Sequence, residues 1–226
     1  MIELKVVLIH ATELAVKPVS TAFQQLWPQA RCMNVLDDGL TSDLIRAGSL
    51  TDSMVARMVS LAKYSQSAGA HGILYTCSAF GAAIDEAKKT VDLPILKPNE
   101  AMFDEALDIC EKLGGRRRIG LLTTFKPASV TMRDELEVAI HARNLPVQVE
   151  SACDQKAIEA LNVGDVGMHD QLVVDLARTL VECDVLLLGQ FSMARSQKLV
   201  AEATQKTVLS SPDSAVRRLK SMLAPC

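Results

Sequence analysis

The run GILYTC, residues 72–77, decides how the chain folds. An apolar run of this length, followed by small polar side chains, is typical of a strand that is buried on both faces of a parallel sheet. A run of the same kind, VLLLGQ, occupies residues 185–190, which lie 113 positions further along, half of the 226-residue chain. The two runs indicate that one structural plan is used twice.

Working outward, the same offset of 113 residues aligns further strand patterns. Residues 6–10 fall on 119–123, residues 94–96 fall on 207–209, and Leu36 meets Val149. Strand periodicity alone would not keep four separated pairs at one offset without an insertion, so we interpret the chain as an internal repeat. A chance alignment of apolar strands is the alternative.

Longer segments of helical period separate the apolar runs, which is the pattern of an α/β protein with parallel strands. One helix is predicted from residue 51 to about 67, closed by Gly69, and another over 99–113, closed by the glycines at 114–115. The predicted strands are residues 4–9, 32–36, 72–76, 94–96, 118–123, 147–149, 185–189 and 206–209.

Composition excludes several classes of function. Lys and Arg number 24 against 27 Asp and Glu, a net charge of −3, which argues against binding to nucleic acid or to an anionic membrane. No stretch approaches the roughly 18 apolar residues of a membrane span, and residues 6–9 are too short for an export signal. The six cysteines show no metal-ligand spacing, so we expect a reduced cytoplasmic location and no structural metal.

Two repeated α/β halves would each contribute the carboxyl ends of their strands to a shared crevice, where open parallel sheets bind ligands. Residues at equivalent strand ends should then face each other across it. The expected pairs are His10 with Thr123, Asp37-Asp38 with Glu150-Ser151, and Cys77 with Gln190.

Cys77 is the strongest candidate for chemistry, because it follows a buried strand and opens a helix. Free N–H groups and the helix dipole favour a thiolate there, so we expect a lowered pKa. The same N–H groups, with the hydroxyls of Thr76 and Ser78, would form a cradle for a carboxylate. The alternative is that Cys77 is a small buried hydrophobic residue.

Other strand ends offer polar groups without thiol chemistry. Gln190 and Ser192 can present neutral donors and acceptors, and the pair Thr123-Thr124 can hold another oxygen or merely cap a turn. His10 could supply a second acid or base near neutral pH, or simply bond its neighbouring loop. Asp37 could orient the thiol or bind a substrate amine, or belong to an Asp-Asp-Gly turn.

These pieces resemble the aspartate/glutamate racemase superfamily, which includes hydantoin racemases, maleate isomerases and arylmalonate decarboxylases. The matching segments are residues 76–81 (TCSAFG), 91–96 (VDLPIL), 118–124 (RIGLLTT) and 187–194 (LLGQFSMA). The resemblance implies two pseudo-symmetric α/β halves with the active site in the cleft between them. It also implies that the end helix returns to the first half, which gives residues 1–98 with 210–226 and residues 99–209.

The resemblance further implies that a substrate carboxylate is held between two cysteines, one from each half. Here only the first is present, as Cys77, and Gln190 stands where the racemase pattern has the second. A carboxamide cannot relay a proton as a thiol can, so a symmetric two-thiol racemisation is not supported. The candidate site comprises catalytic Cys77 and the substrate-binding residues His10, Asp37, Thr76, Ser78, Ala79, Thr123, Thr124, Gln190, Phe191 and Ser192.

The function we expect is therefore cofactor-independent proton transfer at the carbon α to a carboxylate, by a racemase-like isomerase or, second, a decarboxylase. Two alternatives stay open: a non-catalytic member of the family that binds small carboxylates, and a hydrolase or isomerase that uses Cys77 as a nucleophile. The expected partner is a small-molecule carboxylate, and a homo-oligomer stays open.

Overall fold

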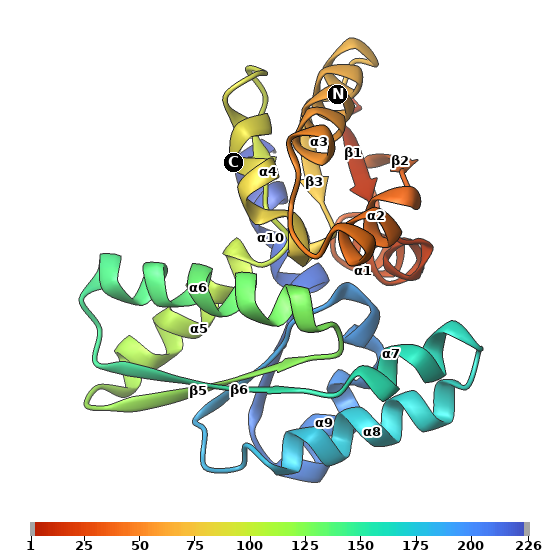
Figure 1. The fold of residues 1–226 in the computed structure, drawn as a ribbon. Helices are drawn as coiled ribbons and strands as arrows, with labels where there is room; N and C mark the ends of the chain where they lie inside the picture. The colour runs from red at the N-terminus through yellow and green to blue at the C-terminus, as the bar shows by residue number, and fades with distance from the viewer. Residues whose placement is uncertain (1–2, 224–226) are drawn as a thin grey trace. The chain divides into compact units, whose positions relative to one another are not determined.

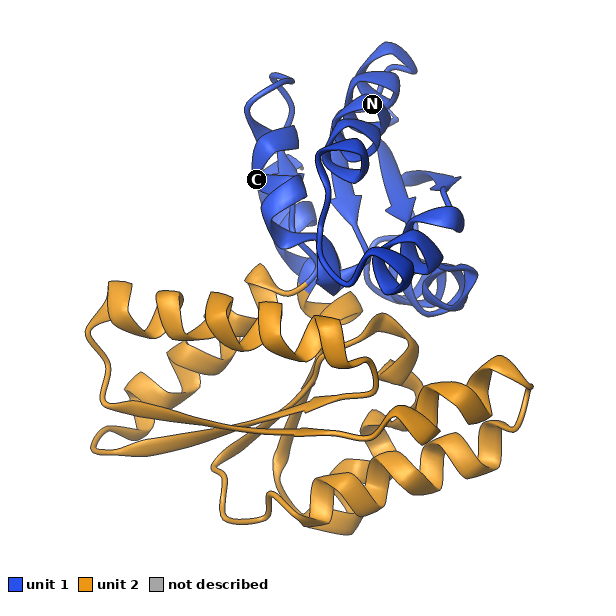
Figure 2. Cartoon of the chain, viewed as in Figure 1, with its two compact units in different colours: residues 1–98, 215–226 blue, residues 99–214 orange. Residues whose placement is uncertain are grey.

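The computed structural model describes residues 3–223 and contains two four-stranded parallel sheets, each surrounded by helices (Figure 1). The chain divides into two compact units (Figure 2). Unit 1 consists of residues 1–98 and 215–226, and unit 2 of residues 99–214. The predicted fold class, α/β with two parallel-sheet halves, is confirmed.

The sheet of unit 1 has the strand order β2-β1-β3-β4, and every pair is parallel. Its strands are β1 (Lys5–His10), β2 (Arg31–Leu36), β3 (Gly72–Tyr75) and β4 (Ile95–Leu96). Residues 6–9 of β1 and 73–75 of β3 are buried, as continuous apolar runs in a sheet covered on both faces require.

Helices of unit 1 follow each of the first three strands. They are η1 (Glu13–Ala15), α1 (Val16–Leu26), α2 (Gly39–Ala47), α3 (Asp52–Ser67), η2 (Ser78–Phe80) and α4 (Gly81–Lys88). The predicted limits of α3 are confirmed, because the Thr51 side chain caps its start and Gly69, at φ +77°, follows its end. A last helix, α10 (Ser211–Leu223), begins in unit 2 and joins unit 1 from Ala215 onward.

The sheet of unit 2 repeats this plan, with the order β6-β5-β7-β8 and parallel pairing throughout. Its strands are β5 (Arg117–Thr123), β6 (Val147–Cys153), β7 (Val185–Leu188) and β8 (Thr207–Ser210). The central strand β7 is fully buried.

Helices cover both faces of the unit 2 sheet (Figure 1). On one face lie α5 (Glu100–Leu113) and α6 (Lys126–Arg143), and on the other α7 (Gln155–Asn162), α8 (Val166–Arg178) and α9 (Gln197–Thr204). A short helix, η3 (Phe191–Ser196), connects β7 to α9. The predicted helix 99–113 is confirmed by α5.

The register of the two sheets confirms most of the internal repeat. In unit 1 Ile9 pairs with Tyr75, and in unit 2 Leu122 pairs with Leu188, so β1 with β5 and β3 with β7 are each related by 113 residues. The pairs β3·β4 and β7·β8 keep the same offset.

The second strand departs from that offset. His10 pairs with Leu36 but Thr123 pairs with Cys153, which places equivalent positions of β2 and β6 117 residues apart. The prediction that Leu36 corresponds to Val149 is therefore wrong. Four additional residues therefore lie between β5 and the paired part of β6. The alternating exposure of β6 hid the true length of this edge strand from an apolar-run signal.

This shift also moves the polar residues expected at the end of β6. Residues 150–151 lie inside the strand, so their predicted equivalence to residues 37–38 is wrong. Asp154 instead corresponds to Asp37, because its N–H bonds the Thr123 carbonyl as the Asp37 N–H bonds the carbonyl of His10.

The seven other strand predictions are confirmed to within one residue at each end. In most of them the apolar run coincides with the buried part of the strand, which is why the sequence locates them well; the edge strand β2 is only half-buried. None of the helices within residues 3–223 combines the length and hydropathy needed to cross a membrane.

Candidate active site

The strand order of each sheet locates a ligand-binding edge. In unit 1 the chain leaves β1 toward β2 on one side and returns to β3 on the other, so the order reverses between β1 and β3. In unit 2 it reverses between β5 and β7. Open parallel sheets bind ligands beyond the carboxyl ends of the strands at such a point.

The candidate residues gather at these two edges. In unit 1 the reversal brings together His10, at the end of β1, and residues 76–79, which follow β3. In unit 2 it brings together residues 123–124 and 190–192. The sequence prediction and the topology therefore select the same strand ends within each unit.

Cys77 occupies the turn from β3 into η2. It is the residue before the first turn of η2, with φ −112° and ψ 115°, and its side chain is half-buried. The backbone N–H of Ala79 donates to the thiol and favours the thiolate, as predicted for a helix start. Burial outweighs that bond and raises the pKa of Cys77 to about 11. The prediction of a lowered pKa is wrong, because removal from water disfavours the charged form more than one N–H stabilises it.

Alkylation of the free protein should follow this thiol chemistry. At pH 8 we expect iodoacetamide to modify the exposed Cys153 before Cys77. Between pH 8 and 10 the Cys77 rate should rise about tenfold per pH unit, since the thiolate fraction does so below the pKa. Peptide mass spectrometry resolves the two sites, and Cys32, whose pKa burial also raises to about 11, serves as a comparison. A Cys77 rate that levels off below pH 9 would contradict the burial argument.

His10 is fully buried, and both of its ring nitrogens are hydrogen-bonded. Nδ1 lies 2.8 Å from the Thr76 hydroxyl, and Nε2 lies 2.9 Å from Oδ1 of Asn34. Burial lowers the pKa of His10, and the bond to Asn34 opposes the shift. The imidazole is therefore neutral at pH 7 and has its hydrogen-bonding capacity occupied within unit 1.

Asp37 lies at the carboxyl end of β2, where it is paired with a cation. Its carboxylate accepts from Nε of Arg57 at 2.9 Å and from a second nitrogen of the same guanidinium. Nη1 of Arg57 also donates to Asp43 at 2.6 Å. Arg57 of α3 is thus paired with two carboxylates, at and just before α2. The Asp37 carboxylate, which we expected to orient the thiol or bind an amine, is already neutralised by this ion pair.

Ser78 and Ala79 form the first turn after Cys77 and are almost fully buried. Thr76 is buried beside them, and its hydroxyl lies within reach of His10 and, at 3.3 Å, of the Ile9 carbonyl. The half-buried thiol of Cys77 therefore lies between chain neighbours that are themselves buried.

In unit 2, Gln190 takes the place that Cys77 has in unit 1. Its Oε1 accepts from the Thr124 N–H at 2.9 Å, and the Thr124 hydroxyl lies 3.5 Å from the same oxygen. An N–H can only donate, so this bond fixes which end of the carboxamide faces Thr124. Nε2 of Gln190 is buried and has no hydrogen-bond partner within the described part of the chain. A buried donor left in this state is a ready partner for an oxygen of a ligand.

Close packing explains why a glycine precedes Gln190. A Cβ on Gly189 would lie 2.9 Å from the Leu122 carbonyl oxygen and 2.7 Å from Cε of Met132. Gly189→Ala should lower the free energy of unfolding by about 1–3 kcal/mol through this overlap. The matched control is Gly167→Ala in α8, where the nearest atom lies 3.9 Å away and helix propensity favours Ala by about 1 kcal/mol. Urea denaturation compares the two variants, and equal midpoints would contradict the packing argument.

The remaining unit 2 candidates lie in or near the core. Thr123 is fully buried, and its hydroxyl lies 3.4 Å from the Ala152 carbonyl. Phe191 is 1 % exposed and Ser192 is 7 % exposed, so both residues are almost fully buried. Of this group, Thr124 and Gln190 are joined by hydrogen bonds.

Sequence reasoning missed polar residues after the outer strands. Asn99 is fully buried, and its Oδ1 accepts from the Ser211 hydroxyl at 2.7 Å. Its Nδ2, like that of Gln190, lacks a hydrogen-bond partner among residues 3–223. Extending the strand-end rule to β4 and β8 would have pointed to both residues. Asn34 and Arg57 carried no such signal, because their roles depend on side-chain contacts across elements.

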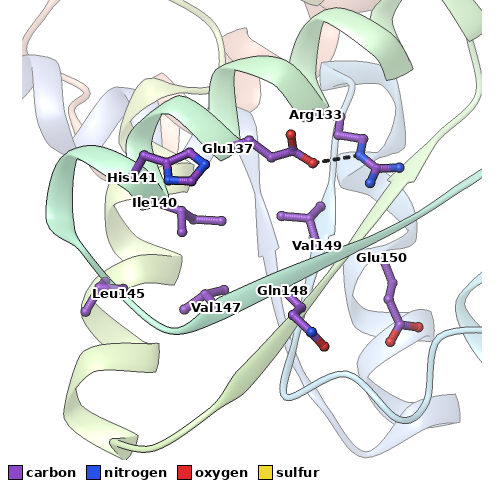
Figure 3. A pocket seen from close by; sticks show the side chains of 9 residues that line it. All are labelled: Arg133, Glu137, Ile140, His141, Leu145, Val147, Gln148, Val149 and Glu150. Atoms are coloured by element: carbon purple, nitrogen blue, oxygen red, sulfur yellow. Dashed lines mark hydrogen bonds and ion pairs between the residues drawn. The ribbon is translucent and has the colours of Figure 1, made fainter.

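A groove of about 460 Å³ lies elsewhere in unit 2, between the second half of α6 and the start of β6 (Figure 3). Three of its charged residues are already paired, Arg133 with Glu137 at 2.9 Å and Glu150 with Arg118 at 3.4 Å. It contains none of the candidate site residues. Within residues 3–223 no group of three His, Cys, Asp or Glu side chains is placed to hold a metal ion.

Two α/β units, with Cys77 and Gln190 at equivalent strand ends, define the class of protein, and comparison with known proteins identifies its family. The sequence profile of the Asp/Glu/Hydantoin racemase family matches residues 4–219. The chain belongs to this family, as its resemblance implied.

Solved structures agree on the fold. The chain is similar to glutamate racemase isoform RacE1 from Bacillus anthracis, with 15% identity, a TM-score of 0.75, and coverage of 97% of this chain and 81% of that one. It is also similar to allantoin racemase from Klebsiella pneumoniae, with 16% identity, a TM-score of 0.72, and coverage of 98% of this chain and 88% of that one. It is similar as well to Picrophilus torridus aspartate racemase, with 18% identity, a TM-score of 0.71, and coverage of 97% of this chain and 94% of that one. No curated protein sequence matches the chain.

Proposed function

We propose that this protein is a cofactor-independent enzyme that transfers a proton at the carbon α to a carboxylate of a small substrate, with Cys77 as its single proton-transferring thiol. The observation that carries the proposal is the position of Cys77 in a racemase-family fold. It stands where the strand order reverses, and the Ala79 N–H bonds its sulfur. At the equivalent position of unit 2 stands Gln190, which does not titrate.

The protonation state of Cys77 sets the direction of the chemistry. With a pKa of about 11, the thiol carries its proton at pH 7. It is therefore ready to act as a general acid toward an enolate, whose electron pair forms the C–H bond at the α-carbon as the S–H bond breaks and leaves a thiolate. Water returns the proton to the sulfur at the end of the cycle.

Gln190 has a complementary role in the proposal. Its Nε2 donor, held in place by the Thr124 N–H, would bind an oxygen of the substrate carboxylate or of the enolate formed from it. Fixed donors aimed at developing negative charge are a large source of rate enhancement. A neutral amide suits this role because it neither gives up nor takes a proton.

Decarboxylation is the second candidate reaction, and the raised pKa of Cys77 favours it. When CO₂ leaves, the electron pair of the broken C–C bond remains on the α-carbon as an enolate. The reaction then needs one acid and no base, which a single protonated thiol supplies. Racemisation by one thiol requires instead that Cys77 first remove a proton.

The test is incubation of the full-length protein in D₂O with amino acids, hydantoins, 2-hydroxy acids and substituted malonates. NMR follows deuterium at the α-carbon, and CO₂ release is measured in parallel. Exchange without CO₂ release supports the isomerase, and CO₂ release with one deuterium incorporated supports the decarboxylase. Binding without either outcome across the panel would identify a silent carboxylate-binding protein and overturn the proposal.

A further inference from the structure

A row of hydrogen bonds leads from the exposed edge strand of unit 1 into its buried centre and ends one residue before Cys77. It passes from Asn34 on β2 to His10 on β1 and on to Thr76 after β3, with distances of 2.9 and 2.8 Å. Neither His10 nor Thr76 is more than 4 % exposed. The row crosses three adjacent strands at the reversal of strand order.

The direction of each bond follows from chemistry. With Oδ1 of Asn34 facing the ring, Nε2 of His10 must carry the ring proton, because a carbonyl oxygen can only accept. A neutral imidazole then has no proton on Nδ1, so Nδ1 accepts from the Thr76 hydroxyl. All the hydrogen-bonding atoms of the His10 ring are engaged inside the unit.

We propose that His10 is a positioning residue that acts on Cys77 through Thr76, and that it does not contact the substrate. This assignment replaces the substrate-binding role expected from the sequence. It rests on the proposed function only in taking Cys77 as the reacting group.

The backbone shows how His10 exerts its effect. The Thr76 N–H donates to the Ile9 carbonyl at 3.0 Å, and its hydroxyl donates to His10. Main chain and side chain of Thr76 are thus both tied to β1, and Cys77 is the next residue. Without the Nδ1 acceptor, the hydroxyl retains only the longer contact to the Ile9 carbonyl, at 3.3 Å. The segment that carries the thiol then loses one of its two ties and admits water.

Two substitutions of His10 test its two hydrogen bonds separately, the bond to Thr76 and the bond to Asn34. In His10→Asn the side-chain oxygen can stand where Nδ1 stands, the same number of bonds from Cβ, and can accept from Thr76. In His10→Gln the amide nitrogen can replace Nε2 toward Asn34, and no acceptor remains at the Nδ1 position for Thr76. Thr76→Val and Thr76→Ser form a second pair, which removes or keeps the hydroxyl.

The first readout needs no substrate. Peptide mass spectrometry measures alkylation of Cys77 by iodoacetamide at pH 8, with Cys153 as the internal reference. We expect His10→Gln and Thr76→Val to speed Cys77 alkylation at least about fivefold, because water reaching the sulfur lowers its pKa. His10→Asn and Thr76→Ser should remain within about twofold of the parent protein, since the tie is kept.

The second readout is turnover of a substrate found in the D₂O panel. His10→Gln should lower kcat about tenfold or more with KM unchanged, because a displaced thiol is poorly aligned in the transition state. Faster alkylation together with slower turnover is a combination that removal of a substrate contact would not produce.

Defined outcomes overturn the inference. Equal Cys77 alkylation in His10→Asn and His10→Gln would show that the bond to Thr76 does not matter. A rise in KM at unchanged kcat would make His10 a substrate ligand. If His10→Gln fails to fold, the Thr76 pair decides alone. If no substrate is turned over, the proposed function fails while the alkylation comparison still tests His10.

Discussion

Cys77→Ala is expected to abolish α-carbon deuterium exchange and CO₂ release. No other thiol lies at the reversal of strand order in unit 1, as far as residues 3–223 describe it. General acid–base catalysis by one side chain contributes about 10²–10⁴-fold, so the loss should reach at least about 10³-fold for a group that both gives and regains the proton. NMR exchange in D₂O measures it against the parent protein.

Two controls make the result specific to the thiol. Cys77→Ser keeps the size and the hydrogen bond from Ala79 but raises the energy needed to form the anion, so it should be almost as inactive. Cys153→Ala removes the exposed cysteine of β6 and should retain full activity. Urea midpoints check that all three variants fold. Activity in Cys77→Ala above one tenth of the parent value would refute the role of the thiol.

Gln190→Cys is expected to change the outcome of the reaction rather than its rate alone. The substitution gives unit 2 a thiol after β7, in the place that Cys77 has after β3. A two-thiol enzyme can remove a proton from one side of an α-carbon and deliver one to the other. A substrate that the parent protein exchanges with retention should therefore racemise, at a rate about tenfold or more above background.

The control for this gain is Gln190→Ser, which truncates the amide without supplying a thiol. It should weaken substrate binding and produce no racemisation. The double variant Cys77→Ala with Gln190→Cys should lose racemisation as well, because two thiols are needed. Chiral chromatography of the recovered substrate reports all three. Racemic product from Gln190→Ser, or optically unchanged product from a folded, substrate-binding Gln190→Cys, would show that positions 77 and 190 do not act as a pair.

The fold was predictable because strands that are buried in a parallel sheet have continuous apolar sequences. β7 is fully buried and was located to within one residue. β6 lies at a sheet edge and alternates between half-buried and exposed residues, so only its first three residues carried the signal. The four-residue insertion between β5 and β6 escaped notice for the same reason.

The strand-end positions of the candidate residues were predictable, but their chemical states were not. The strand-end rule found Cys77, His10 and Gln190, because topology alone places them. The pKa of Cys77 was wrong in direction, since burial depends on packing that no local pattern encodes. The tie from His10 to Thr76 was likewise hidden, because it joins residues 66 positions apart.

The path of α10 affects the order in which the protein can be completed during synthesis. Its last turn brings Leu223 against Gly72 in β3, and Lys220 donates to the Leu26 carbonyl at 3.0 Å. Residues 99–214 form an uninterrupted stretch, so a nascent chain can close unit 2 before unit 1 has its final helix. Unit 1, which contains Cys77, can therefore be completed only after unit 2 has been synthesised.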